Sequence, residues 1–126
     1  MTKYKTQKLK NTFANAKKGI QLVLKSERNI RIHLIIAAAI ILAGILFDFS
    51  TTKICVLLLT ISSVICAEMV NSALEFSLDA VFHNKYSRLV GMAKDIAAGA
   101  VMFTSIIAGL IGLILFLPPI FKMFFD

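Results

Sequence analysis

Long apolar stretches alternate with short polar segments along most of this chain, a pattern typical of several membrane-crossing helices. The apolar stretches cover residues 32–47, 54–74 and 96–117. A helix needs about 20 residues to cross a hydrocarbon core of about 30 Å, so the first stretch is short and its flanking residues Arg31 and Asp48 have to reach the interface from its ends. We therefore expect three transmembrane helices, of which the third ends at Pro118-Pro119.

A different pattern precedes the first span, over about residues 5–25. Apolar residues recur there at helical spacing, and basic or polar residues lie opposite them. The apolar set is Leu9, Phe13, Ala16, Ile20, Val23 and Leu24, and the opposite set is Lys10, Lys17, Lys18, Gln21 and Lys25. This predicts a basic amphipathic helix in the membrane interface, and a soluble helix that packs on a partner has the same pattern.

The composition agrees with an all-α integral membrane protein that forms one domain over residues 1–126. Hydrophobic residues make up 58% of the chain and charged residues 17%, whereas soluble domains are about half apolar and about a quarter charged. The apolar majority argues against a nucleic-acid partner despite the net charge of +7. Since no small-residue cleavage site follows the basic segment, we do not expect a secretory signal peptide.

The basic residues predict how the spans are oriented. Nine of the fourteen Lys and Arg residues precede the first span, and the second loop region carries Lys85, Arg88 and Lys94. The first loop contains only Lys53, and the tail only Lys122. Because cytoplasmic loops are enriched in basic residues, we expect the N-terminus and the second loop in the cytoplasm and the C-terminus outside.

Polar side chains gather on one face where the second span ends. They are Glu68, Asn71, Ser72, Glu75 and Asp79, and the opposite face holds Val70, Ala73 and Phe76. Charged groups within a span are costly, face the bundle interior and mark functional sites. Glu68 follows fourteen uncharged residues, less than a full span, which favours a functional role there. For Asp79 an ordinary solvated position remains equally open.

Two further clusters lie at the same predicted membrane face. Lys94-Asp95 stands before the third span, where an interfacial anchor would have the same sequence, and Glu27 stands before the first span. Glu27 and Arg31 are four residues apart, so a simple helix ion pair is the alternative for this acid. Together the clusters provide carboxylates, an amide and a lysine beside a basic surface helix.

These residue types suit phosphoryl transfer. Carboxylates beside phosphate oxygens are the ligands that Mg²⁺ prefers, and a lysine neutralises charge on a transferring phosphoryl group. A carboxylate also accepts the proton of an attacking hydroxyl. Glu68 and Glu75 are separated by about 10 Å of helix rise, so one can act as base and the other as metal ligand. Neither a Walker loop nor the glycine loop of protein kinases is present, so a nucleotide site must be built differently.

Two other classes of protein stay open at this stage. A small proton-coupled exporter also uses an intramembrane carboxylate, but it places that group in the first span, and residues 32–47 contain no acid. A structural membrane subunit is the other class, assembled through the small residues Gly99, Gly109 and Gly112 of the third span.

The segments Glu68-Met69-Val70-Asn71-Ser72-Ala73-Leu74-Glu75 and Ala93-Lys94-Asp95-Ile96-Ala97-Ala98-Gly99-Ala100-Val101 resemble the signature of the prokaryotic diacylglycerol kinase family. The resemblance covers nearly the whole chain. It implies a homotrimeric, multi-pass enzyme of the bacterial cell membrane. Such an enzyme transfers the γ-phosphoryl group of MgATP to a lipid alcohol, at sites shared between subunits near the cytoplasmic interface.

The resemblance also implies residue roles. Glu68 would be the general base, Glu27 and Glu75 the carboxylates for metal and nucleotide, and Asn71 a supporting residue of the site. The nucleotide contacts would be Lys94, Asp95, Lys8, Lys85 and Tyr86. Asn15 stands where members that act on diacylglycerol have an aromatic residue, so no nucleotide role is assigned to it.

The family that this chain resembles contains enzymes for two lipid acceptors, undecaprenol and diacylglycerol. Glu27-Arg28-Asn29, residues 97–101 and the ending at 111–118 are more similar to the undecaprenol kinases. The chain also has no tryptophan, unlike the diacylglycerol type. We therefore expect undecaprenol as the acceptor, with diacylglycerol as the alternative.

Overall fold

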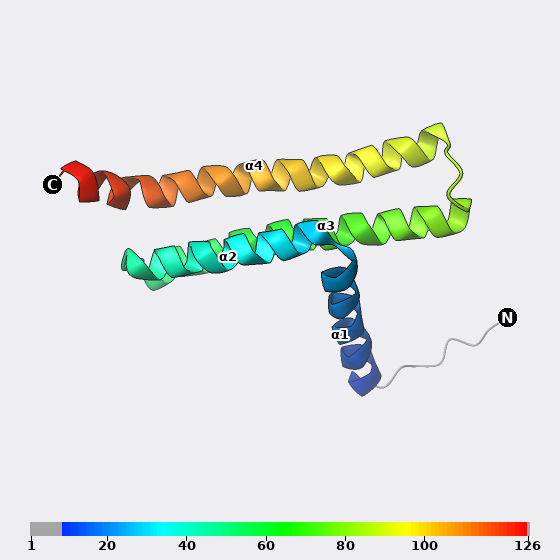
Figure 1. Ribbon diagram of the computed structural model, residues 1–126, viewed down its shortest axis with the longest axis horizontal. Coiled ribbons are helices and arrows are strands. Elements are labelled where there is room, and N and C mark those ends of the chain that lie inside the picture. The colour runs from blue at the N-terminus through cyan, green and yellow to red at the C-terminus, as the bar shows by residue number, and fades with distance from the viewer. Residues whose placement is uncertain (1–8, 126) are drawn as a thin grey trace.

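The computed structural model describes residues 9–125, which form four helices. These are α1 (Leu9–Ser26), α2 (Arg28–Leu46), α3 (Thr51–Phe82) and α4 (Arg88–Phe125). Helices α2, α3 and α4 are each long and apolar enough to cross a membrane, and they run alongside one another, while α1 leaves them at a steep angle (Figure 1). The prediction of an all-helical chain with three spans is confirmed.

The helices that contain the second and third spans are longer than those spans. Helix α3 has 32 residues and α4 has 38, so they rise about 48 Å and about 57 Å, well beyond a hydrocarbon core of about 30 Å. The sequence pattern identified only the apolar part of each helix, residues 54–74 and 96–117. The last turns of α3 and the first turns of α4 flank the connection between the two helices and project past the junction of α1 and α2 (Figure 1).

The predicted end of the last helix at Pro118-Pro119 is wrong, because α4 continues through both prolines to Phe125. Proline removes one hydrogen bond of the helix and crowds the preceding turn, but it does not forbid the helical backbone. Beyond the prolines the rings of Phe121 and Phe125 stack with centroids 4.7 Å apart. This contact between residues one turn apart stabilises the final turns.

Two tight connections join the spans. After α2, Asp48 adopts a left-handed backbone with φ 52°, and the Ser50 side chain then accepts a 3.4 Å hydrogen bond from the Lys53 backbone at the start of α3. After α3, His83 and Asn84 are both left-handed, with φ 49° and 58°. A left-handed residue after the last turn is a common helix ending, and Asn tolerates it well.

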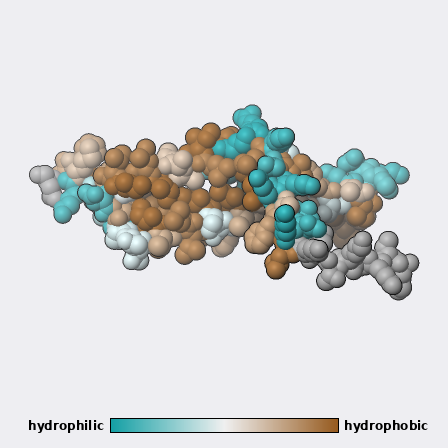
Figure 2. All heavy atoms as spheres, turned by 90° about the horizontal axis from the view of Figure 1, so that it is seen from below, coloured by the Kyte–Doolittle hydropathy of each residue, from teal (hydrophilic) through white to brown (hydrophobic). Residues whose placement is uncertain are grey.

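The helices bury little of their surface against one another. The buried apolar residues are Val23, Ile30, Ala37, Leu57, Val64, Val90 and Ala97. Apolar side chains cover most of the length of the α2–α4 bundle in the view of Figure 2, with hydrophilic residues concentrated near α1 and towards the ends. An apolar surface of this extent is typical of a protein that faces lipid. The two cysteines, Cys55 and Cys66, are free and exposed.

Helices α2 and α3 approach each other closely at Gly44. A Cβ atom there would come within 3.2 Å of both Ile54 and Leu57, which is tighter than ordinary van der Waals contact. The absence of a side chain at Gly44 therefore lets the two helices meet near their connection.

Candidate functional site

The polar face predicted for α3 points into the helix bundle. Glu68 and Ser72 are buried, with relative exposures of 7% and 2%, and Asn71 and Glu75 are half-buried. On the opposite side Val70 and Phe76 are exposed. The sequence therefore predicted correctly which side of α3 carries the polar groups.

Glu68 has a partner on the neighbouring helix. Nε2 of His33, on α2, lies 3.3 Å from Oε1 of Glu68, and the two side chains are 32% and 9% exposed. Since a buried carboxylate needs a polar partner, this contact explains how the bundle accommodates Glu68 at that depth. It also places an imidazole next to the carboxylate that the family resemblance implies as the base.

Asn71 and Glu75 form a second pair one turn further along α3. Nδ2 of Asn71 donates a 3.4 Å hydrogen bond to Oε1 of Glu75. The other amide atom, Oδ1 of Asn71, is buried and has no hydrogen-bond partner among residues 9–125. A buried acceptor of this kind is uncommon and indicates a place for a donor or cation that residues 9–125 do not supply.

Lys94 is bound to the polar face of α3 by an ion pair. Its Nζ atom lies 2.6 Å from Oδ1 of Asp79, and the two side chains are 34% and 40% exposed. The amine of Lys94 on α4 thus meets one carboxylate of α3, that of Asp79. Lys94 is more than an isolated interfacial anchor, and Asp79, which the sequence left open, takes part in the cluster.

Glu27 lies at the sharp break between α1 and α2. It is the N-cap residue of α2, in an extended conformation. The ion pair considered for Glu27 and Arg31 does not form. Instead, the Arg31 guanidinium donates hydrogen bonds of 2.8 Å and 2.9 Å to the carbonyl oxygens of Leu24 and Lys25, where it caps the end of α1. Within the described chain the Glu27 carboxylate therefore remains available to a ligand.

Three of the other predicted nucleotide contacts lie in or near the connection between α3 and α4, which we call the rim. Asp95 and Lys85 are exposed and have no side-chain hydrogen bond or ion pair with any residue in 9–125. The Tyr86 ring is 84% exposed, yet its edge rests on Gly91, where an added Cβ would lie 3.1 Å from the ring. Lys8 lies outside the described residues. The structure therefore brings Lys94 into the cluster, while Asp95 and Lys85 stay outside it.

The carboxylate and amide oxygens of this site suit a metal ion that takes most of its ligands from a substrate and from water. No three His, Cys, Asp or Glu side chains between residues 9 and 125 are close enough to hold a metal ion on their own. Mg²⁺ binds through one or two carboxylates together with substrate phosphates and water. The Glu75 carboxylate and the unpaired Oδ1 of Asn71 fit that mode of binding. They offer oxygen ligands on one side of an ion and leave its other side to phosphate oxygens.

His33 is the residue of this site that the sequence interpretation did not identify. The signal was present, because His33 is the one polar side chain in the first predicted span, at 32–47, and it lies just inside the start of that span. A polar residue within an apolar stretch calls for a partner. The partner comes from α3, and only the packing of α2 on α3 reveals it.

Sequence similarity relates this chain to known proteins. The sequence profile of the prokaryotic diacylglycerol kinase family matches residues 14–116. A diacylglycerol kinase of Synechocystis sp. is 36% identical over 112 residues, which are 89% of this chain and 64% of that protein. An undecaprenol kinase of Bacillus subtilis is 34% identical over 109 residues, 86% of this chain and 88% of its own length. The chain thus spans somewhat under two thirds of the first relative and most of the second.

Proposed function

Because this chain belongs to the prokaryotic diacylglycerol kinase family of lipid kinases, we propose that it transfers the γ-phosphoryl group of ATP to a membrane lipid alcohol, and that undecaprenol is the preferred acceptor. The single observation that supports this most directly is the buried carboxylate of Glu68, held at the end of the apolar part of α3. A carboxylate at that depth can reach a hydroxyl group that is attached to a lipid.

In the proposed reaction Glu68 is the general base. Its carboxylate accepts the hydroxyl proton while the lipid oxygen forms a bond to the γ-phosphorus of ATP. The bond from the γ-phosphorus to the bridging oxygen breaks, and ADP leaves. His33, at 3.3 Å from Glu68, orients the carboxylate, and the burial of Glu68 keeps water from competing for the phosphoryl group.

The nucleotide is proposed to bind at the rim, where α3 and α4 extend beyond the hydrocarbon. Lys94, positioned by Asp79 at 2.6 Å, neutralises phosphate charge. Asp95, Lys85 and Tyr86 complete the set of nucleotide contacts. We also propose Lys8 as a nucleotide contact.

Mg²⁺ is the metal we propose, held by Glu75 and Glu27 and supported by the amide oxygen of Asn71. When bound with ATP, a magnesium ion neutralises the charge of the phosphate oxygens. The protein's own contribution is to hold carboxylates next to that charge. The hydrogen bond from Asn71 to Glu75, at 3.4 Å, fixes the direction of one of them.

The orientation follows from the charge pattern. We propose that the α1 side and the α3–α4 connection face the cytoplasm and that the C-terminus lies outside, in a bacterial cell membrane. The steep angle between α1 and the spans suits a helix that lies in the interface. Its apolar residues Leu9 and Phe13 are 78% and 74% exposed and would enter the lipid there.

The preference for undecaprenol rests on particular residues. The two relatives are named for different acceptors and match this chain about equally, at 36% and 34% identity. The segment Glu27-Arg28-Asn29 and the absence of tryptophan favour the undecaprenol type. The match to the B. subtilis undecaprenol kinase also extends over 88% of that protein.

We extend the proposal to a homotrimer with shared sites. Glu27 and Asp95 have no polar side-chain partner within residues 9–125, and the face of α3 that carries Glu75 is only half-buried. A second copy beside these residues would complete the site. Cross-linking of the purified protein, with the mass of the largest product, tests the number of copies.

The decisive experiment compares the two acceptors directly. Purified protein in mixed micelles receives ATP labelled at the γ-phosphate, with undecaprenol in one set and diacylglycerol in the other. We expect labelled lipid phosphate from both and a larger kcat/KM for undecaprenol. A larger value for diacylglycerol would reverse the assignment of the acceptor, and no labelled lipid from either would refute the proposed reaction.

A further inference from the structure

Arg31 of α2 ties the end of α1 to the start of α2. One nitrogen of its guanidinium, Nη1, donates hydrogen bonds of 2.8 Å and 2.9 Å to the carbonyl oxygens of Leu24 and Lys25. The last four carbonyl groups of a helix have no partner within that helix, and the helix dipole stabilises a positive charge beside them. A side chain of the second helix therefore supplies the cap of the first, across the break between the two.

Little of α1 is buried, so its direction depends on the end that Arg31 caps. Val23, in the last turn, is the one buried residue among the 18 of α1. At the far end of the helix Leu9 and Phe13 are 78% and 74% exposed, whereas Ile30, just beyond the break, is only 2% exposed. The steep angle between α1 and α2 (Figure 1) is therefore set within about two helical turns around the break.

Glu27 stands at the break itself. Its backbone is extended, with φ −103° and ψ 107°, and its side chain makes no capping hydrogen bond to α2. Its backbone N–H donates a 2.8 Å hydrogen bond to the Val23 carbonyl in the last turn of α1. Glu27 is thus attached to α1 on one side and begins α2 on the other, so a change in the angle between the helices would move its carboxylate.

Arg31 can take either of two partners, and only one of them leaves Glu27 free. On a continuous helix Glu27 and Arg31, four residues apart, would form an ion pair, and the carboxylate would then be occupied. With the break in place the guanidinium binds the carbonyl groups of α1 instead. The cap therefore holds the break and withholds a competing cation from Glu27 at the same time.

We propose that Arg31 is a positioning residue, which caps α1 and thereby keeps the Glu27 carboxylate unpaired and in one place for Mg²⁺. The inference rests on the proposed function, in which Glu27 is a ligand of that ion, and it adds the residue that places this ligand. Arginine suits the role because its planar guanidinium donates in fixed directions, whereas the ammonium of lysine is a single point on a flexible stem.

Three variants separate the cap from the charge. Arg31→Ala removes both, and Arg31→Lys keeps the charge but not the fixed geometry. Arg28→Ala is the matched control, because it removes one positive charge from the first turn of the same helix. Arg28 is exposed and makes no hydrogen bond or ion pair with any residue between 9 and 125.

The first experiment measures the break directly, with the full chain in nanodiscs. Spin labels are attached through Thr12→Cys on α1 and Ala80→Cys on α3, two exposed positions, with Cys55 and Cys66 replaced by serine. Labelled copies are diluted with unlabelled protein, and the distance is measured by double electron–electron resonance.

We expect one narrow distance in the parent and in Arg28→Ala, a broad distribution in Arg31→Ala and an intermediate width in Arg31→Lys. A peak as narrow as that of the parent in Arg31→Ala would overturn the inference. If Arg31→Ala does not assemble, the same criterion applies to Arg31→Lys.

The second experiment measures cation binding without turnover. Mn²⁺, which prefers the same oxygen ligands as Mg²⁺, is titrated with a non-hydrolysable ATP analogue, and the signal of the free ion reports the bound fraction. We expect Arg31→Ala to raise the Kd for Mn²⁺ by about tenfold, as for other residues that orient a metal ligand. Arg31→Lys should raise it less, and Arg28→Ala should leave it unchanged.

A double-mutant cycle tests whether Arg31 acts through Glu27. In a Glu27→Gln background, Arg31→Ala should raise the Kd for Mn²⁺ no further, because the ligand that Arg31 positions is already lost. An additive increase would show an independent role and overturn the inference. An unchanged Kd in Arg31→Ala alone, even with a broadened distance, would show that Arg31 shapes the break without serving Glu27, and would overturn it as well.

Neither measurement requires turnover, so this inference and the proposed reaction can fail separately. If Arg31→Ala loses the narrow distance and the cation affinity while the parent phosphorylates no lipid alcohol, the reaction is wrong and the positioning role stands. If the parent phosphorylates undecaprenol and Arg31→Ala keeps both properties, the positioning role is wrong and the reaction stands.

Discussion

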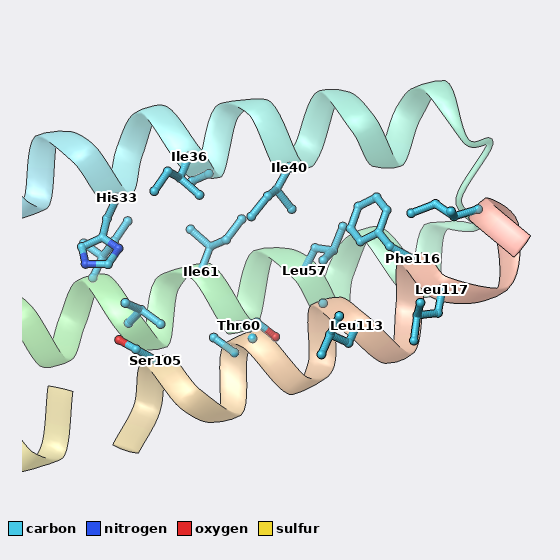
Figure 3. Close-up of a pocket in the computed structure, with 17 residues that line it drawn as sticks. His33, Ile36, Ile40, Leu57, Thr60, Ile61, Ser105, Leu113, Phe116 and Leu117 are labelled. Carbon is cyan, nitrogen blue, oxygen red and sulfur yellow. The ribbon is translucent and has the colours of Figure 1, made fainter. Parts of the chain in front are cut away.

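His33 on α2 and Glu68 on α3 meet inside the bundle, with Nε2 and Oε1 at 3.3 Å. Each residue is polar within a mainly apolar stretch of helix, and each gains from the other the partner that lipid cannot supply. The contact fixes the rotation of α2 against α3 at the level of the proposed reaction. It also joins the proposed base to an apolar groove between α2, α3 and α4, which His33 lines (Figure 3).

The contact predicts that His33 positions Glu68. In His33→Phe an aromatic ring remains at this position and the polar contact is lost, so we expect kcat for lipid phosphorylation to fall by about tenfold, the cost of one hydrogen bond to a charged group. The KM for ATP should not change, because His33 lies away from the rim. His33→Gln retains a side-chain donor and should recover most of the rate. Equal losses in both variants would mean that His33 acts through packing alone.

Removal of the base itself should have a larger effect. Glu68→Gln keeps the shape of the side chain but cannot accept the hydroxyl proton, and general bases contribute about 10²–10⁴-fold to a rate. We expect a loss of that size with unchanged helix content by circular dichroism. Ser77→Ala, outside the polar face of α3 and with its hydroxyl bonded to the Ala73 carbonyl of the same helix, is the control that keeps full activity. Substantial activity in Glu68→Gln would remove Glu68 from this role.

The sequence predicted much of this site because a helix has a fixed period. Once residues 68–79 were assigned to one helix, the polar face followed from the spacing alone, and the exposure of Val70 and Phe76 confirms it. The apolar composition of the three stretches likewise identified the spans. Both predictions depend on local geometry, which the chain determines over a few turns.

What the sequence did not predict depends on contacts between helices. The partner of Glu68 comes from α2, and the partner of Lys94 is Asp79 from α3. The spacing of Glu27 and Arg31 leaves a helix ion pair open as an alternative, but the break at Glu27 brings the end of α1 within reach of Arg31 instead. The groove is visible only once three helices are packed together.

The Asp79–Lys94 pair predicts a defect in nucleotide binding with little loss of stability. Both side chains are about a third exposed or more, and ion pairs of that kind contribute about 0.2–1 kcal/mol. We expect Lys94→Ala to raise the KM for ATP by about tenfold, and Asp79→Asn by less, since the amine remains. The double variant should be no worse than Lys94→Ala, because Asp79 acts through Lys94. Additive effects in this double-mutant cycle would show independent roles.

The proposed Mg²⁺ site predicts that a substitution at Glu75 shifts the Mg²⁺ dependence of the reaction. Removal of divalent cations with EDTA should abolish phosphorylation, and added Mg²⁺ should restore it. Glu75→Gln loses one anionic oxygen ligand, so the Mg²⁺ concentration at half-maximal rate should rise by about tenfold or more at fixed ATP. Asn71→Ala removes the unpaired Oδ1 and should shift the Mg²⁺ dependence in the same direction. If neither variant changes that dependence, these residues do not hold the metal.

The contact between Tyr86 and Gly91 allows a test of nucleotide binding at the rim in which no charged group is changed. In Gly91→Ala the new Cβ would lie 3.1 Å from both Cε2 and the hydroxyl oxygen of Tyr86, too close for the ring to stay in place. Because the ring is 84% exposed, it can move away at little cost in stability. If Tyr86 covers the nucleotide, this displacement should raise the KM for ATP several-fold and leave the KM for the lipid unchanged.

Gly19→Ala in α1, where an added Cβ meets no atom within 4 Å, controls for the change in helix propensity. A normal KM for ATP in Gly91→Ala, together with a normal value in Tyr86→Ala, would exclude Tyr86 from the nucleotide site.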